Sequence, residues 1–181
     1  MPADWDSFRP LSKEVYAPDG QVTKLSKAVL AKLRDQALAA PAKKSRILLH
    51  GDPENDLHEM VITHTRDTYI RPHINETSAK SFLVVDGKIV VCYFDQRGNV
   101  TDRFLLQEVC GGGDFFLRFE RPVFHTIVVL SDTVTFIETI RGPHRETKYA
   151  PFAPASEDEK AGDYFATLEQ DSRNWLGSQG V

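Results

Sequence analysis

The chain contains few cysteines and no long hydrophobic segment. Its two cysteines among 181 residues, Cys92 and Cys110, are too few for a disulfide framework, so a buried core has to hold the fold together. A hydrophobic content of 41% is sufficient for one domain of this size. No apolar run is long enough to span a bilayer, and the first residues lack the apolar stretch of a signal peptide. We therefore expect a soluble, single-domain protein of the reducing cytoplasm with no membrane partner.

An excess of positive charge is also absent. Lysine and arginine total 22 against 26 acidic residues, which gives a formal net charge of -4. Such a chain has no broad basic surface to neutralise phosphates, so we expect no nucleic-acid partner. The glycine run at residues 111–113 precedes a strand-like segment and has neither the helix nor the lysine of a phosphate-binding loop. We therefore expect no nucleotide cofactor.

Hydrophobic periodicity divides the chain into four parts. Residues 1–23 are rich in proline and charge and predict an irregular extension. Residues 24–41 predict an amphipathic helix, and residues 46–148 predict strands. Residues 149–181 form a proline-containing tail that permits a short helix around residues 163–169 before it frays. We expect the first helix to start after Ser26 as its N-cap, with an apolar stripe of Val29, Leu30, Leu33 and Ala37.

The region 46–148 consists of short β-branched and aromatic runs with a period of two, which favours an all-β sandwich or barrel. Asp86-Gly87 and the DQRGN stretch at residues 95–99 are strong turn signals and predict hairpins, with the flanking strands as antiparallel neighbours. The expected strands are HEMVITHT, DTYIRPH, KSFLVV, KIVVCYF, DRFLLQEV, DFFLRFE, FHTIVVL and TVTFIETI.

Alternation of side chains places several polar groups among the expected strands. Tyr69, Arg71, His73 and Asn75 share one face, which must point at solvent or into a wet cavity. Glu138 lies in the apolar row Val134, Phe136 and Ile140, where an unpaired carboxylate costs several kcal/mol, so it needs a partner, a proton or a metal. An ion pair with Arg71 is one structural solution. We expect surface or loop positions for His50, His58, His64 and His144.

Three segments together resemble one known family: RPHIN leading to VVDGKIVVCYFDQRGNVTDR, then GGGDFFLRFERPVFHTIVVL, then FIETIRGP followed by FAPAS. The pattern, over roughly residues 24–155, resembles the cupin superfamily and within it the WbuC-type cupin fold metalloproteins, which are RmlC-like cupins associated with surface-polysaccharide (O-antigen) gene clusters. The resemblance implies a double-stranded β-helix, or jelly roll, flanked here by an N-terminal amphipathic helix and a short C-terminal helical tail. It also implies a homodimer and a divalent metal held by three histidines and a glutamate.

The ligand set that the resemblance implies is incomplete. His73 and His125 match two of the histidines, whereas Asn75 stands in place of the third and Lys80 in place of the glutamate. A lysine ammonium has no lone pair and repels a divalent ion, and an asparagine oxygen is a poor substitute for imidazole. This favours a weakly held or absent metal (zinc, iron, nickel or manganese) over a tight site. A rescued site would need inward-facing side chains from the group His50, His58, His64 and Glu138.

Three functions remain open at this stage, including whether the chain is an enzyme. The first is a small-molecule-binding cupin that takes an anionic or sugar-derived ligand through Arg71, Asn75, Lys80 and Tyr93. The second is an isomerase, epimerase or dioxygenase, in which His73 and His125 bind the metal and Glu138 is a third ligand or base. A metal-free variant would pair a histidine base with Tyr69 or Tyr93 as the acid. The third is a catalytically inert scaffold.

Overall fold

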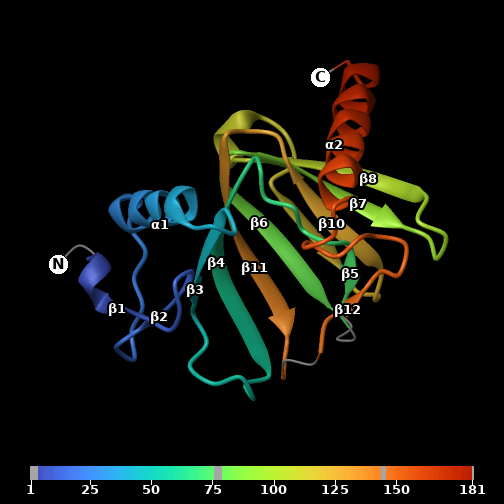
Figure 1. The fold of residues 1–181 in the computed structure, drawn as a ribbon. Coiled ribbons are helices and arrows are strands. Elements are labelled where there is room, and N and C mark those ends of the chain that lie inside the picture. The colour runs from blue at the N-terminus through green and yellow to red at the C-terminus, as the bar shows by residue number, and fades with distance from the viewer. Residues whose placement is uncertain (1–3, 76–78, 144–145, 181) are drawn as a thin grey trace.

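Two β-sheets face each other, and each carries a helix on its outer side (Figure 1). The computed structural model describes residues 4–75, 79–143 and 146–180. The seven-stranded sheet has the order β1 (Phe8–Pro10), β2 (Val15–Pro18), β3 (Lys44–Leu48), β4 (Leu57–Thr65), β11 (Thr133–Arg141), β6 (Lys80–Asp86) and β9 (Phe116–Phe119). The five-stranded sheet has the order β12 (Lys148–Tyr149), β5 (His73–Ile74), β10 (Phe124–Val129), β7 (Lys88–Phe94) and β8 (Val100–Gln107). The helices are η1 (Trp5–Ser7), α1 (Lys27–Ala39), η2 (Val109–Gly111) and α2 (Ala161–Ser178).

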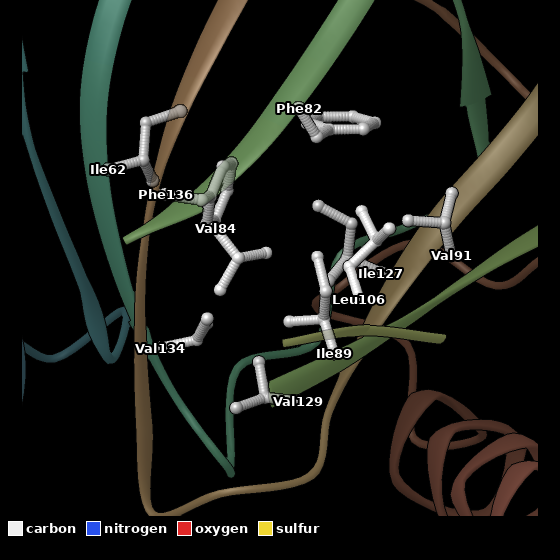
Figure 2. Close-up of a cluster of buried hydrophobic side chains, with 10 residues drawn as sticks. All are labelled: Ile62, Phe82, Val84, Ile89, Val91, Leu106, Ile127, Val129, Val134 and Phe136. Carbon is white, nitrogen blue, oxygen red and sulfur yellow. The ribbon is translucent and has the colours of Figure 1, made fainter. Parts of the chain in front are cut away.

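Alternating side chains from both sheets form the core between them (Figure 2). Phe82 of β6 and Phe136 of β11 are each 1% exposed and meet edge to face, with ring centroids 5.8 Å apart. Branched residues of β7, β10 and β11 fill the remaining space, as expected for a jelly roll whose inner faces are dry. The cluster comprises Ile62, Phe82, Val84, Ile89, Val91, Leu106, Ile127, Val129, Val134 and Phe136.

Helix α1 covers the outer face of the seven-stranded sheet. It begins where the sequence predicted, because the Ser26 hydroxyl accepts a hydrogen bond from the backbone N–H of Val29 at 3.3 Å. Val29 and Leu33 are fully buried against Ile47 and Val61 of β3 and β4. Since Ile47 and Val61 point outward to the helix, their neighbours along β3 and β4 point into the barrel.

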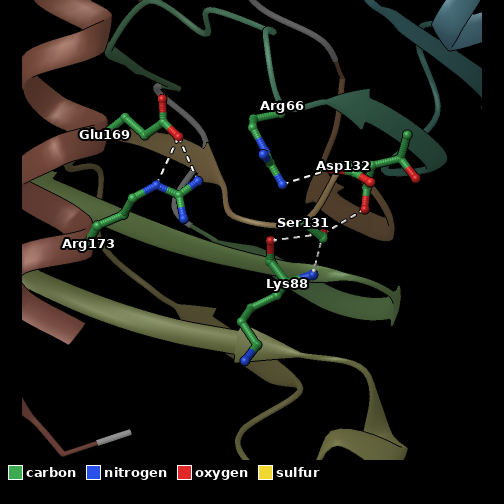
Figure 3. A network of polar contacts seen from close by, with 7 residues as sticks. Arg66, Lys88, Ser131, Asp132, Glu169 and Arg173 are labelled. Carbon is green, nitrogen blue, oxygen red and sulfur yellow. Dashed lines mark hydrogen bonds and ion pairs between the residues drawn. The ribbon is translucent and has the colours of Figure 1, made fainter. Parts of the chain in front are cut away.

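Helix α2 covers the outer face of the five-stranded sheet and is longer than predicted. The expected helix ended near residue 169, whereas α2 runs to Ser178. Two features extend it: Trp175 and Leu176 continue the apolar contact that Leu168 makes with β7 and β10, and Arg173 pairs with Glu169 at 2.6 Å (Figure 3). No helix among the described residues has the length and apolarity needed to cross a membrane.

Three connections in which the chain passes from one sheet to the other lie together at one end of the barrel (Figure 3). The Ser131 hydroxyl, between β10 and β11, accepts from the backbone N–H of Lys88 at 2.9 Å and donates to the carbonyl of Thr133 at 2.6 Å. Arg66, after β4, pairs with Asp132 at 2.8 Å. These contacts close this end of the barrel.

The Asp86-Gly87 signal was wrong as a hairpin prediction. Strands β6 and β7 lie in different sheets, so Gly87 is a corner at which the chain changes sheet. Gly87 has φ +87, and a Cβ there would lie 2.5 Å from the Thr133 carbonyl oxygen and 2.7 Å from the Ser131 hydroxyl. The second turn signal is confirmed, because β7 and β8 are paired through residues 95–99, where the backbone N–H of Asp95 donates to the Asn99 carbonyl.

Several segments differ from their expected structure. The extension at residues 1–23, predicted to be irregular, contributes β1 and β2, because Phe8 and Tyr16 bury their rings beside α1 and β2 pairs in parallel with β3. The strand expected at DTYIRPH is reduced to the two residues of β5, since Tyr69 and Arg71 bond to the C-terminal segment and not to a neighbouring strand. Strand β3 was not predicted, because its residues alternate charged and apolar only over a short run.

Candidate functional site

A cavity of about 560 Å³ lies between the sheets. This volume is in the range of pockets that hold small molecules. Its apolar wall comprises Ile62, Phe82, Ile127 and Phe136 of the core cluster (Figure 2). Polar and charged side chains from β3, β4, β5, β6, β10 and β11 also line it, as do residues 155–157 and several residues of the connecting segments.

Two histidines occupy adjacent strands in the cavity wall. His73 of β5 and His125 of β10 are direct register partners, and their ring centroids are 4.6 Å apart. Nδ1 of His73 lies 3.0 Å from the Arg71 carbonyl, and Nδ1 of His125 lies 2.9 Å from the Val123 carbonyl. Because a carbonyl only accepts, each Nδ1 carries a proton, and in the neutral ring Nε2 keeps a lone pair.

Burial keeps both rings neutral. Desolvation lowers the pKa of His73 to about 4, with the nearby Lys80 ammonium as the second cause. The pKa of His125 also lies well below its usual value, first because of burial and then because of Lys80. The two Nε2 atoms are therefore hydrogen-bond acceptors across the neutral pH range.

Lys80 and Glu138 form a buried ion pair beside His125. Nζ of Lys80 lies 3.2 Å from Oε2 of Glu138 and 3.3 Å from Nε2 of His125. The side chains of Lys80 and Glu138 are 4% and 14% exposed, so the pair is largely desolvated. Both carboxylate and imidazole accept hydrogen bonds from the ammonium. Lys80, and not Arg71, is thus the partner that the carboxylate of Glu138 requires.

The donor set does not fit the divalent metal that the family resemblance implies. Nε2 of His125, the atom that would face the ion, instead accepts from the Lys80 ammonium. Glu138, the expected third ligand, binds the same ammonium. Over the described residues, no three histidine, cysteine, aspartate or glutamate side chains gather in a metal-binding arrangement. The rescued site through His50, His58 or His64 is therefore not formed.

Arg71 and Tyr69 hold the C-terminal segment against the barrel. Arg71 donates from Nε to the carbonyl of Ala153 at 3.0 Å and from Nη2 to the carbonyl of Ala150 at 3.2 Å, and its guanidinium stacks 5.1 Å from the Tyr149 ring centre. The Tyr69 hydroxyl donates to the carbonyl of Pro154 at 2.9 Å. Burial raises the pKa of Tyr69 to about 12. With its proton already donated to a carbonyl, Tyr69 is poorly placed as the catalytic acid expected from the sequence.

Asn75 and Tyr93 occupy different environments. Asn75 lines the cavity, and its side-chain oxygen Oδ1 is buried without a hydrogen-bond partner among the described residues. Tyr93 packs edge to face on Phe104 and Phe119, at centroid distances of 4.9 and 5.5 Å. Burial raises the pKa of Tyr93 to about 12. Asn75 therefore has a free acceptor facing a ligand site, whereas Tyr93 belongs to the aromatic packing and is not among the described cavity-lining residues.

Sequence reasoning missed part of the cavity. His58 and His64, expected on the surface or in loops, are 4% and 7% exposed, because even-numbered residues of β4 face the barrel interior. His50 stacks on His58 with centroids 4.0 Å apart, and both line the cavity. His144 lies outside the described residues. Lys44 and Arg46 of β3 also line the cavity. The alternation in KSRILLH at residues 44–50 was the available signal for this wall.

Comparison with known proteins supports the assignment of the fold. The family described as "Domain of unknown function (DUF6016)" matches residues 25–106, which is less than half of the chain. No curated protein matches in sequence. Among solved structures, the polyketide cyclase RemF from Streptomyces resistomycificus is similar with a TM-score of 0.50 and 14% identity, covering 71% of this chain and 82% of RemF.

Two further structures have lower TM-scores. A cupin superfamily protein from Desulfitobacterium hafniense gives 0.42 at 9% identity, covering 54% of this chain and 76% of that one. Procruciferin, an 11S globulin from Brassica napus, gives 0.43 at 13% identity and covers 52% of this chain, which spans only 23% of procruciferin.

The order of strands in the two facing sheets, together with the likeness to RemF, shows a jelly roll of the cupin type, as predicted from the sequence. Within the barrel, a lysine and glutamate pair lies beside two neutral histidines. At these levels of identity the likeness extends to the fold alone.

Proposed function

We propose that this chain is a small-molecule-binding cupin that holds an anionic or sugar-derived ligand in the barrel, without a resident metal at His73 and His125. One observation carries the proposal: the Lys80 ammonium binds both His125 and Glu138 inside a cavity of about 560 Å³. The lysine supplies the positive charge that a metal ion would supply. It binds a ligand by donating hydrogen bonds, whereas a metal ion would coordinate the ligand's lone pairs.

Several contacts support a ligand with hydroxyl or carbonyl groups. Nε2 of His73 is an acceptor that receives no hydrogen bond from another described residue. Oδ1 of Asn75 is a second such acceptor, and hydroxyl protons match both. We extend the proposal, on the family resemblance, to a WbuC-type role in cytoplasmic surface-polysaccharide synthesis.

We also propose a homodimer. The outer edge of β9 is a free sheet edge in the described chain, and Phe115 and Phe116 are 40% and 47% exposed there. A solution mass of about twice 20.4 kDa would agree with this, and a mass of a single chain would contradict it.

A second candidate function is metal-free isomerisation or epimerisation of a sugar-derived substrate. The neutral His73 ring favours it, because its Nε2 lone pair can accept a proton from a bound substrate. The low pKa of His73 limits its strength as a base, and Tyr69 is engaged with Pro154. Binding is therefore the function that the site supports better.

Thermal stability in the presence of candidate ligands tests the proposal. The panel contains sugar nucleotides, sugar phosphates, neutral sugars and small carboxylates. A true ligand at a hundredfold excess over its dissociation constant stabilises the fold by about 2.7 kcal/mol. The Lys80→Met/Glu138→Leu variant, which replaces the ion pair by apolar side chains, should lose this response. The Lys32→Met variant on the exposed face of α1 is the matched control.

Three outcomes are informative. Stabilisation of the wild-type protein and the Lys32→Met control, but not of the double variant, is the expected result. No response to any compound would contradict the proposal and favour an inert scaffold. Near-stoichiometric zinc, iron, nickel or manganese in protein purified without chelator, lost on His125→Ala, would contradict the metal-free site and favour a metal-dependent enzyme.

A further inference from the structure

We propose that the anionic group of the ligand binds at His64, Lys44 and Arg46, on the β3 and β4 side of the cavity, and not at Lys80. This subsite deepens the proposed function and rests on it. It assigns a phosphate or carboxylate to one end of the cavity and the uncharged polar part of the ligand to the His73 and Lys80 end.

The first step is the charge balance at Lys80. Its ammonium already has a carboxylate partner, Glu138, at 3.2 Å, and a second acceptor in His125. A ligand anion at Lys80 would have to share the ammonium with Glu138 and would lie close to a like charge, which is unfavourable in a desolvated site. The buried pair as a whole is close to neutral, so it suits hydroxyl and carbonyl groups better than an anion.

The second step is the position of the cations on β3. Ile47 is buried against α1, so Lys44 and Arg46, which lie at alternate positions before it along the strand, belong to the strand's cavity side, and both line the cavity. Lys44 is the direct register partner of His64, and Arg46 is the partner of Ile62. Cross-strand partners have Cβ atoms only about 5 Å apart. Lys44, Arg46 and His64 therefore form one group at the edge of the cavity.

Among the residues that the structure describes, neither cation has an acidic partner in an ion pair. Over the described residues, no ion pair within 4.0 Å joins Lys44 or Arg46 to a carboxylate. Glu14 and Glu157 also border the cavity, but the Glu14 carboxylate accepts from the backbone N–H of Ala42 at 3.4 Å, and Glu157 is exposed. The two β3 cations are thus available to an anion that enters from solvent.

His64 supplies an independent observation that points to a ligand. The side chain is 7% exposed, lines the cavity and packs edge to face on Phe136 at 5.4 Å, yet its Nδ1 is buried with no hydrogen-bond partner in the described chain. A buried polar atom without a partner is costly. Burial, followed by the positive charges of Lys44 and Arg46, lowers the pKa of His64 to about 3. A bound anion would offset the two positive charges and would accept a hydrogen bond from Nδ1 when that atom carries a proton.

The distance between the two ends sets the ligand class. Met60, the β4 partner of Glu138, precedes His64 by four residues, which corresponds to about 13 Å along the strand. Ile62 of β4 and its register partner Phe136 of β11, both apolar and both lining the cavity, lie between these positions. The ligand is therefore an elongated molecule with a phosphate or carboxylate at one end, a polar uncharged end and an apolar or flat middle.

Inorganic phosphate is the probe, read by NMR of the histidine rings at pH 6 to 8. Phosphate should shift the His64 resonances and raise its pKa. Arg46→Gln and Lys44→Gln should each weaken phosphate binding by roughly tenfold, the loss typical of one charged hydrogen bond. The matched control is Arg34→Gln on the exposed face of α1. The Lys80→Met/Glu138→Leu variant, which leaves the three residues of the subsite in place, should lose less phosphate affinity than Arg46→Gln does.

Two results would overturn the subsite. One is phosphate binding that survives in Arg46→Gln but is lost in the Lys80→Met/Glu138→Leu variant, which would place the anion at Lys80 and leave the proposed function intact. The other is wild-type protein whose His64 resonances do not move at the highest soluble phosphate concentration. Failure of the proposed function is seen separately, in the ligand panel, because neutral sugars there do not need the anion subsite.

Discussion

An ammonium group inside the barrel changes what the neighbouring histidine does. His125 has a proton on Nδ1, fixed by the Val123 carbonyl, so its Nε2 lone pair faces inward in the orientation that would suit a metal. Lys80 fills that direction with a donor at 3.3 Å. Glu138 then compensates the charge. The consequence at the scale of single residues is that Lys80 and Glu138 depend on each other.

Removing one member of this pair should destabilise the fold more than removing both. Lys80→Met leaves the Glu138 carboxylate buried without its cation and should lower the free energy of unfolding by about 3 kcal/mol at pH 7. The double variant Lys80→Met/Glu138→Leu should recover most of this loss, since apolar residues of similar size replace a buried pair at little cost. Urea unfolding of the wild-type, both single variants and the double variant measures the coupling.

The pH dependence of stability distinguishes an unpaired buried charge in Lys80→Met from a simple packing defect. In Lys80→Met the buried charge has no cation beside it, so the variant's deficit should shrink as the solution is acidified toward about pH 4 and the charge is lost. A deficit that is the same at all pH values, with no recovery in the double variant, would show that Lys80 and Glu138 are not energetically coupled.

The residues of the site were only partly predictable. His73 and His125 could be paired from the two motif segments, because strand phase fixes which side chains face inward. The direction of Lys80 could not, since the NETSA stretch before it has no periodic pattern that would fix the phase of the strand. The need of Glu138 for a partner was predicted from its apolar row, but the partner was wrong: Arg71 was one candidate, and it binds the C-terminal segment. The sequence shows that Glu138 needs a positively charged partner, but it does not show which of the candidate cations lies close enough.

At the scale of elements, the C-terminal segment is part of the cavity wall. Residues 155–157 line the cavity, and the preceding residues are held by Arg71, Tyr69 and the backbone bond from Ala150 to the Pro72 carbonyl. A loop that bonds to the barrel through a few contacts opens more easily than a strand within a sheet. We therefore expect this part of the cavity wall to open at a lower free-energy cost than the sheets do.

Arg71→Met should loosen this segment without unfolding the barrel. The substitution keeps an apolar stem but removes two charge-assisted hydrogen bonds, to Ala150 and Ala153. The backbone amides of Ala150 and Ala153 are themselves hydrogen-bonded, so their exchange with solvent is measurable. Hydrogen exchange at these amides should accelerate by roughly tenfold or more.

The matched control is Arg66→Met, which removes an exposed pair with Asp132 at the closed end of the barrel. Exchange at Ala150 and Ala153 should stay at the wild-type rate in this variant, because surface pairs contribute little. Equal acceleration in both variants would indicate global loosening, and unchanged exchange in Arg71→Met would show that Arg71 does not hold the segment.

Helices and strands were predicted correctly where one hydrophobic periodicity continues over many residues. Helix α1 and the long strands β4, β7, β10 and β11 follow from their patterns. The corner at Gly87 has the same local sequence as a hairpin, and only the neighbouring Ser131 and Thr133 decide that the chain changes sheet. The end of α2 likewise depends on Trp175 and Leu176 meeting the outer face of β7 and β10, a long-range contact.

At the scale of the whole molecule, the negative net charge of the chain does not extend to the cavity. The chain has a formal net charge of -4, whereas the cavity lining has the cations Lys44, Arg46, Arg71 and Lys80 against the carboxylates Glu14, Glu138 and Glu157. Three buried rings, His64, His73 and His125, are kept neutral there by desolvation and by Lys44, Arg46 and Lys80. The folded state thus resists proton uptake by groups that take up protons readily when unfolded.

Stability should therefore fall as the solution is acidified below the ordinary histidine pKa. The unfolded chain protonates His64 near pH 6.5, whereas the folded chain does so only near its lowered pKa of about 3. Between these values the unfolded state binds more protons, so the free energy of unfolding decreases as pH falls. His64 alone should contribute a loss of about 2 kcal/mol between about pH 7.5 and pH 5.

His64→Gln isolates this contribution, because glutamine does not titrate. Urea unfolding at several pH values should give a wild-type curve that falls more steeply than the variant's, by about 2 kcal/mol over the interval. Arg34→Gln, on the exposed face of α1, should run parallel to the wild-type curve. Saturating phosphate should flatten the wild-type curve if the anion binds at His64, since a bound anion favours the charged ring. Parallel curves for wild-type protein and His64→Gln would mean that folding does not lower the pKa of His64.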